Sequence, residues 1–139
     1  MKIILRQGDS LILRFDRGEE VIEELHNYCR DNNIKAGFIS AIGAVSEVEL
    51  KYYDITEKKY QAKFLKNNLE LVSLLGNMSM HENEVVVHVH GVFSDKEMNT
   101  KAGHVTRMVV AATCEMELRS IKGKISREHS EEIGLKLMK

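Results

Sequence analysis

The order of apolar and polar residues along this chain predicts a fold made mostly of β-strands. Short apolar runs separated by turn residues recur from one end to the other. Residues 2–7 and 10–15 are expected to pair as a hairpin, because Gly8-Asp9 between them is a hairpin signal, although the alternation in these strands is imperfect. The later runs that predict strands are 36–42, 45–55 after a turn at Gly43, 60–65, 69–80, 85–93, 105–113 with a continuation to 121, and a short strand after the turn at 122–124.

One stretch has helical spacing instead of alternation. Residues 17–32 are predicted to form the only clear helix, with Glu19 and Glu20 in its first turn, where the helix dipole favours acidic groups. Asn32-Asn33 is a plausible end for this helix. Five residues fall on one apolar stripe: Val21, Ile22, Leu25, Tyr28 and Cys29.

One helix against about eight strands predicts an α+β fold built on a largely antiparallel β-sheet. The length fits a single domain over residues 1–139, and the chain contains no proline and no low-complexity linker that would divide it. One helix cannot cover both faces of so large a sheet. Apolar segments such as 109–112 therefore need cover, and we expect other subunits to supply it.

Charge and composition narrow the function classes. The formal net charge of −1 gives no electrostatic reason to expect nucleic acid or an anionic membrane as a partner. No apolar run is long enough to cross a membrane, and the apolar N-terminus is broken by Arg6, Asp9 and Arg14, unlike a signal peptide. Cys29 and Cys114 are far apart in the sequence and are expected to be reduced core residues in a cytoplasmic protein.

Candidate chemistry concentrates in one strand. His88 and His90 lie in the apolar run 85–93, and because side chains alternate along a strand they point to the same face, about 7 Å apart. Two neighbouring imidazoles can bind one metal ion. The alternative is a pair of inert, hydrogen-bonded histidines on a half-exposed face.

His104 is a third candidate ligand, in the next apolar run. A hairpin whose tip lies near residues 96–97 would pair His104 directly with His90 on the same face, with their Cβ atoms about 5 Å apart. A slip of one residue would turn His104 to the other face. The metal-binding hypothesis therefore requires this register, with a bulge at Gly103 as one way to reach it.

The remaining polar candidates carry weaker signals. Glu70 is a lone carboxylate among leucines and could be aimed at a site, although an edge or solvent-exposed position explains the pattern better. Alternation places Glu115 and Glu117 on one face, which favours solvent. Three further histidines are expected in solvated positions without ligand spacing: His26 on the helix, His81 in a turn and His129 in a charged stretch.

Several segments, in order along nearly the whole chain, resemble the PPC domain family, named for its occurrence in plants and prokaryotes. The histidine elements of that family are matched by Val87-His88-Val89-His90 and by Gly103-His104. The other matching segments are Gly18-Glu19-Glu20-Val21 with Leu25, residues 38–45 (FISAIGAV), Tyr52-Tyr53-Asp54, residues 69–77 (LELVSLLGN), and Ala112-Thr113-Cys114-Glu115.

The resemblance implies a prokaryotic, stand-alone homotrimer with a zinc site at His88, His90 and His104. It also implies a fold similar to acetolactate decarboxylase, a metal-dependent lyase, which is an analogy of fold and not of activity. Plant members bind DNA through AT-hook segments, but this chain has no Arg-Gly-Arg-Pro core and no proline, which excludes that route.

Three hypotheses follow. The first is a metal-binding trimer, with zinc or another transition metal, acting on a small carbonyl or carboxylate substrate, with Glu70 as acid/base partner. The second is a non-catalytic assembly or regulatory module that recruits a partner protein. The third, which the charge disfavours, is DNA binding without an AT-hook.

Overall fold

The computed structural model describes all 139 residues and contains one helix and nine strands. All strand pairings are antiparallel except a short parallel contact between β5 and β8, so the predicted α+β class with a largely antiparallel sheet is confirmed. Helix α1 (Val21–Asp31) follows β2 and precedes β3 along the chain. The strands are β1 (Lys2–Gln7), β2 (Ser10–Asp16), β3 (Gly37–Asp54), β4 (Lys59–Leu65), β5 (Leu69–His81), β6 (Glu84–Ser94), β7 (Thr100–Ser120), β8 (Ser126–Ser130) and β9 (Leu135–Met138).

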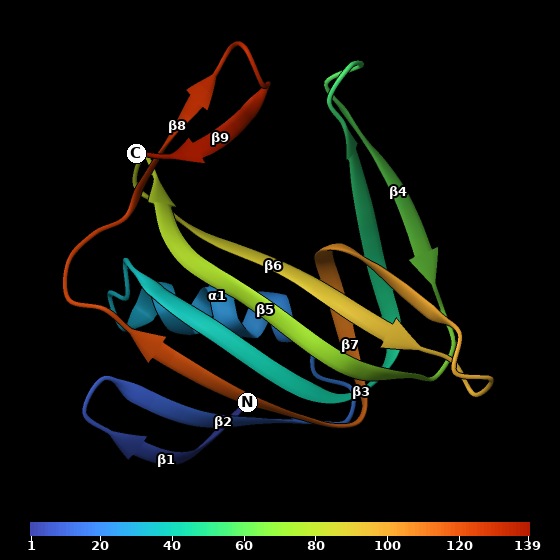
Figure 1. The fold of residues 1–139 in the computed structure, drawn as a ribbon. Coiled ribbons are helices and arrows are strands. Elements are labelled where there is room, and N and C mark those ends of the chain that lie inside the picture. Colours follow the sequence, from blue (N-terminus) through green and yellow to red (C-terminus); the bar gives the residue numbers. More distant parts are fainter.

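The two longest strands, β3 and β7, each serve two parts of the sheet (Figure 1). The first half of β3 pairs with β5, β5 pairs with β6, and β6 pairs with the first residues of β7. His104 and Val105 of that segment, with the β7 residues that follow, pair with the second half of β3, so the pairings return to the strand where they began. The sheet is therefore strongly curved, and β6 and β7 bring their histidines to one place.

Helix α1 covers one face of this sheet. Val21, Leu25 and Cys29, spaced four apart, are fully buried against the strands. The helix begins at Val21, because the Glu20 carboxylate accepts hydrogen bonds from the backbone N–H groups of Ile22 and Glu23 as an N-cap. The expected start near residue 17 is therefore wrong, and Glu20 caps the first turn instead of lying in it. The helix is too short to span a membrane.

The segment before the helix is extended because it bonds to β7. The N–H of Gly18 donates to the carbonyl of Val110, and the N–H of Val110 donates to the carbonyl of Glu19. The expectation that residues 109–112 need cover from another subunit is therefore wrong for Val110. Val110 is 1% exposed and belongs to the chain's own core, and only Ala112 of the four is exposed.

Gly43 is a bulge inside β3 and not the expected turn between two strands. The register of β3 shifts between Ala41 and Gly43 against β5, and again after Gly43 against β7. A Cβ atom at Gly43 would lie 2.3 Å from the carbonyl oxygen of Thr113, so the close approach of two backbones requires glycine here. The bulge lets one continuous strand bend around the core.

The opposite face of the sheet has no cover within the chain. Its apolar residues alternate with the buried ones along β2, β3 and β5, as a strand with two apolar faces requires. Five large apolar side chains on this open face are at least a third exposed: Ile12, Phe38, Ile42, Val72 and Leu75. We use the term open face for this surface of β2, β7, β3, β5 and β6.

Two hairpins, β3–β4 and β8–β9, rise from opposite ends of the β5–β6 pair and project to the same side (Figure 1). Their tips are joined by hydrogen bonds from the Tyr53 hydroxyl to the Ile133 carbonyl, at 2.7 Å, and from the Lys58 ammonium to the Glu131 carbonyl, at 2.6 Å. The base of β8–β9 is tied to β5 by the parallel pairing of Met80 with Ser126. The C-terminal hairpin is therefore held at both ends.

Candidate metal centre

Three imidazoles meet where β6 and β7 pair. His88 and His90 lie two residues apart on β6, and His104 of β7 is directly opposite His90, so the predicted register is confirmed. One ring nitrogen from each of the three lies within 4.8 Å of the others. Their ring centroids are 5.1 to 5.4 Å apart. The fold therefore brings together the three histidines that the sequence singled out.

The register is set by the loop between the two strands. The Asp95 carboxylate accepts hydrogen bonds from the N–H groups of Glu97 and Asn99, which closes the turn tightly. The N–H of Asp95 also donates to the Asn99 carbonyl. Pairing then runs without interruption from Ser94–Thr100 to Val89–Val105, so the bulge considered at Gly103 is absent between these strands.

The environment keeps two of these imidazoles neutral. Burial, together with the nearby charges of His88 and His90, lowers the pKa of His104 to about 4. Burial, followed by the charge of Arg127, also holds the pKa of His88 below its usual value. No carboxylate joins the cluster. Neutral imidazoles are the form that binds metal ions.

One nitrogen of the cluster has no partner in the protein. His104 Nδ1 is buried and makes no hydrogen bond, which is costly for a polar atom unless something binds it. Its ring packs beside Tyr60, with centroids 5.7 Å apart. An orphaned nitrogen within a set of three converging imidazoles fits a metal ligand better than an inert core histidine.

A groove of about 530 Å³ opens beside the cluster, between β4, β6 and the β8–β9 hairpin. Its walls include His88 and His104, the Tyr60 ring, and residues of the hairpin. The cationic side chains of Arg127 and Lys136 line it, and no aspartate or glutamate does. The groove therefore gives access to the histidines through a surface that favours anions.

Arg127 is the site residue that sequence reasoning missed. Its Nη2 lies 3.2 Å from His88 Nδ1 and 2.9 Å from Asn77 Oδ1. Its Nε donates to Ser79 Oγ at 2.7 Å and its Nη1 to the Lys136 carbonyl at 2.8 Å. In the sequence it is one member of a charged stretch, and only the short parallel contact between β8 and β5 brings it to His88.

Glu70, the expected acid/base residue, lies apart from the histidines of its own chain. It is exposed on β5 and pairs with Ser94, four residues after His90, so it is about 13 Å along β6 from that histidine. It does share the open face with Leu75, which pairs with His90.

The other three histidines are outside the cluster, as expected, but two of them are less solvated than predicted. His26 Nε2 lies 3.1 Å from the Val85 carbonyl and His81 Nδ1 lies 3.1 Å from the Arg127 carbonyl, and both side chains are half-buried. His129 is exposed and lines the outer part of the groove, 3.5 Å from Glu131.

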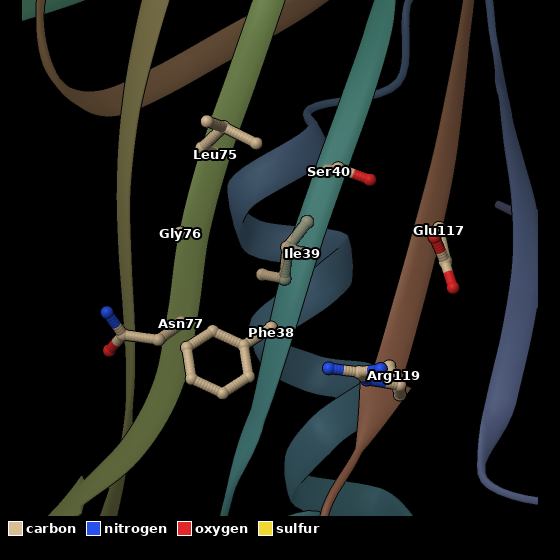
Figure 2. Close-up of a pocket in the computed structure, with 8 residues that line it drawn as sticks. All are labelled: Phe38, Ile39, Ser40, Leu75, Gly76, Asn77, Glu117 and Arg119. Carbon is tan, nitrogen blue, oxygen red and sulfur yellow. The ribbon is translucent and has the colours of Figure 1, made fainter.

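A second hollow, of about 580 Å³, lies on the open face next to the cluster. Figure 2 shows Phe38, Leu75 and Asn77 around it, with α1 on the far side of the sheet. Leu75 pairs with His90, and Asn77 pairs with His88. The apolar open face therefore continues without a break to the edge of the histidine cluster.

Solved structures similar to this chain share its whole fold. A PPC protein from Pyrococcus horikoshii is 31% identical, with a TM-score of 0.89 over 95% of this chain and 92% of that one. A metal-containing protein from Archaeoglobus fulgidus is also 31% identical, with a TM-score of 0.88 over 99% of each chain.

More distant structures support the fold alone. A candidate DNA-binding protein from Bacteroides thetaiotaomicron is 24% identical, with a TM-score of 0.94 over 97% of this chain and 94% of that one. An acetolactate decarboxylase from Bacillus subtilis is 14% identical, with a TM-score of 0.57 over 88% of this chain and 57% of that one. The expected likeness to acetolactate decarboxylase is thus confirmed at the level of fold.

Sequence comparisons agree with the structural ones. The bifunctional protein GlmU from Synechococcus is 29% identical over 119 residues, which are 84% of this chain and 18% of GlmU. The chain therefore spans less than a fifth of the length of that relative. A family model for the Plants and Prokaryotes Conserved domain, abbreviated PCC or PPC, matches residues 4–122. By that match the chain belongs to the Plants and Prokaryotes Conserved domain family.

Proposed function

We propose that this protein is a metal-binding homotrimer that acts on a small substrate through a carbonyl or carboxylate oxygen. The observation that carries the proposal is the convergence of His88, His90 and His104, with His104 Nδ1 buried and unpartnered. Zinc is the ion that three neutral imidazoles with a fourth position open suit best. A bound zinc ion would act as a Lewis acid toward an oxygen of the substrate.

Two further observations support the metal. A relative that is 31% identical over 99% of both chains is described as metal-containing. The site also holds no carboxylate, so the imidazoles would leave the full charge of the ion to act on the substrate.

The trimer is proposed from the open face and from the resemblance to the PPC family. Phe38, Ile42 and Leu75 are about half exposed or more, and such a patch is typical of a surface that another copy covers. Because Leu75 pairs with His90, that copy would lie next to the metal site. Glu70 would then serve as acid/base group only by reaching the histidines of a neighbouring copy.

The two alternatives remain separate proposals. A non-catalytic assembly module would use the metal for stability and the trimer surface for a partner protein. DNA binding is suggested by the description of the relative from Bacteroides thetaiotaomicron, which is 24% identical. The net charge of −1 argues against DNA, and two free, buried cysteines fit a cytoplasmic protein of any of these functions.

The deciding experiment is elemental analysis by mass spectrometry on untagged, dialysed protein after reconstitution with zinc. We expect about one zinc per chain in the wild type, and near-complete loss in His88→Ala and His104→Ala. His129→Ala, which removes an exposed histidine from the same groove, is the matched control and should keep its zinc. A wild type that binds no metal would refute the proposal.

The metal-bearing hypotheses are separated by a second comparison on the same proteins. If His88→Ala lowers the melting temperature but no lyase or hydrolase substrate is turned over by the wild type, the assembly role is favoured. Glu70→Gln should keep its zinc in either case, because the residue is outside the cluster.

A further inference from the structure

The charge of the groove beside the histidines is unbalanced. Arg127 forms no ion pair, and all four of its hydrogen-bond partners are neutral groups. The groove that it lines also contains Lys136 and has no acidic side chain in its walls. A half-buried guanidinium without a counter-ion is uncommon unless an anion completes the site.

While the histidines hold no metal, nearly all N–H donors of Arg127 are used in hydrogen bonds within the protein. A guanidinium has five N–H groups, one on Nε and two on each Nη. Nε donates to Ser79, Nη1 gives one N–H to the Lys136 carbonyl, and Nη2 gives its two to Asn77 and His88. One N–H, on Nη1, remains free.

A metal ion at His88 would change this count. Arginine cannot accept a hydrogen bond, so His88 Nδ1 must be the acceptor, and the proton of the neutral ring is then on Nε2. A metal bound to Nδ1 would take the lone pair that Arg127 uses. A metal bound to Nε2 would move the proton to Nδ1, where it would face the Arg127 donor. In both cases Nη2 of Arg127 is released from His88.

Metal loading would therefore leave two free N–H groups on Arg127, one on each terminal nitrogen. Two donors from one planar fork match the two oxygens of a carboxylate. The same event would place a divalent cation near the guanidinium, with only neutral imidazoles around it. The two free N–H donors and the positive charge of the ion and the guanidinium would then both favour the binding of an anion.

We propose, on the basis of the metal site proposed above, that the groove binds the carboxylate of a small anionic substrate at Arg127. The reacting oxygen of the same molecule would lie toward the ion at His88, His90 and His104. Lys136 is exposed and adds to the attraction without a fixed contact. The C-terminal hairpin thus supplies specificity for a charged substrate, and the β6–β7 histidines supply the metal.

The test uses protein loaded with Co²⁺, whose visible absorption bands change when an oxygen ligand joins the ion. The probes are pyruvate, which carries a carbonyl and a carboxylate, and methyl pyruvate, which keeps the carbonyl but has no charge. We expect pyruvate to shift the bands saturably and to bind at least about tenfold more tightly than the ester, since a hydrogen-bonded charge pair contributes that much or more.

Variants separate the guanidinium from the metal. Arg127→Gln should weaken pyruvate binding by about tenfold or more and leave the Co²⁺ content at the wild-type level. Arg127→Lys should fall between the two, because it keeps the charge and loses the fork. Arg30→Gln, on the exposed side of α1, is the matched control and should bind pyruvate like the wild type. Circular dichroism of each variant checks that it folds.

The outcomes distinguish this inference from the proposal on which it depends. A protein that takes up neither Co²⁺ nor zinc overturns both. A protein that takes up Co²⁺ but binds pyruvate and methyl pyruvate equally, in the wild type, overturns the anion site and leaves the metal site standing. Wild-type affinity for pyruvate in Arg127→Gln would do the same. Tighter binding of inorganic phosphate than of pyruvate would overturn the assignment to a carboxylate.

Discussion

The two faces of the sheet are built from the same strands and have opposite environments. Leu74 and Leu75 are neighbours on β5, yet Leu74 is 0% exposed on the face that α1 covers and Leu75 is 61% exposed on the open face. Alternation along β2 and β3 repeats this contrast, with buried Leu13 and Ile39 next to exposed Ile12 and Phe38. A strand with leucine on both faces buries both only if each face packs against another layer, and this chain supplies a layer for one face.

The histidines belong to the open side of that contrast. His90 is exposed and pairs with Leu75, and His88 pairs with Asn77, so the cluster lies at the margin of the uncovered apolar surface. A metal site in that position gains a wall from any copy that covers the open face. An assembly that covers the open face would therefore also shape the proposed metal site.

The largest expected effect comes from the buried member of the leucine pair. Leu74→Ala should lower the free energy of unfolding by about 2–5 kcal/mol, because it leaves a cavity between α1 and the sheet. Leu75→Ala should cost far less in a dilute, dissociated sample. Urea unfolding followed by circular dichroism at two protein concentrations measures both.

Concentration is the control in that experiment. If another copy covers Leu75, the cost of Leu75→Ala grows with protein concentration, and that of Leu74→Ala does not change in the same way. Equal and concentration-independent costs for the two leucines would contradict the view that only one of the faces is covered within the chain.

A charge on the open face should break the assembly without unfolding the chain. Leu75→Asp would place an unpaired carboxylate in the proposed interface, so sedimentation velocity should find monomer at concentrations where the wild type is a trimer. Ile4→Asp is the matched control, since Ile4 is 56% exposed on the edge strand β1, away from the histidines. If Ile4→Asp dissociated the trimer and Leu75→Asp did not, the interface would lie at the β1 edge and not on the open face.

Stability of the metal-free protein should depend on pH through the histidines. The unfolded chain protonates His104 near pH 6.5, whereas burial lowers its pKa in the folded chain to about 4. The folded state therefore binds fewer protons in that window, and stability falls as the pH drops from 6.5 to about 4. Because solvent partly screens the half-buried ring, we expect a loss on the order of 1 kcal/mol.

The measurement is urea unfolding of chelator-treated protein at the two ends of that window, for the wild type and for His104→Asn. The carboxylates titrate equally in both proteins, so the difference between them isolates His104. An unchanged pH dependence in His104→Asn would exclude the ring as its source. Half-buried His88 should add to the effect in the same direction, since its pKa is also lowered.

Local sequence signals predicted much of the fold and the core of the site. Alternation identified the strands, the Val21–Leu25–Cys29 spacing identified the helix, and the pair rule for a hairpin placed His104 opposite His90. These features depend on residues close in the sequence or on one turn, where backbone geometry leaves few options. The bend at Gly43 was misread as a turn, because a bulge and a turn both favour glycine.

Features that depend on distant contacts could not be predicted. Arg127 reaches His88 only because β8 returns to β5 through a parallel contact that two residue pairs define. The cover of Val110 depends on the extended segment before α1, which the helical pattern concealed. Burial of His104 Nδ1 likewise results from the packing of three strands and Tyr60. Each is a property of tertiary packing and leaves no local pattern.

The last prediction probes the covered face through the low reactivity of its two cysteines. Cys29 and Cys114 are 0% exposed, and burial raises the pKa of each thiol to about 12. Alkylation by N-ethylmaleimide in the native state should therefore be slower than in urea by a factor on the order of 10³.

A cysteine on the open face completes the comparison. Ser40→Cys, next to Leu75 across β3 and β5, should alkylate quickly in the Leu75→Asp background and slowly in the assembled protein, because only a second copy can protect it. Fast alkylation of Ser40→Cys in both backgrounds would mean that the open face stays open. Fast alkylation of Cys29 would instead mean that α1 detaches readily from the sheet. Both faces would then be accessible to solvent part of the time.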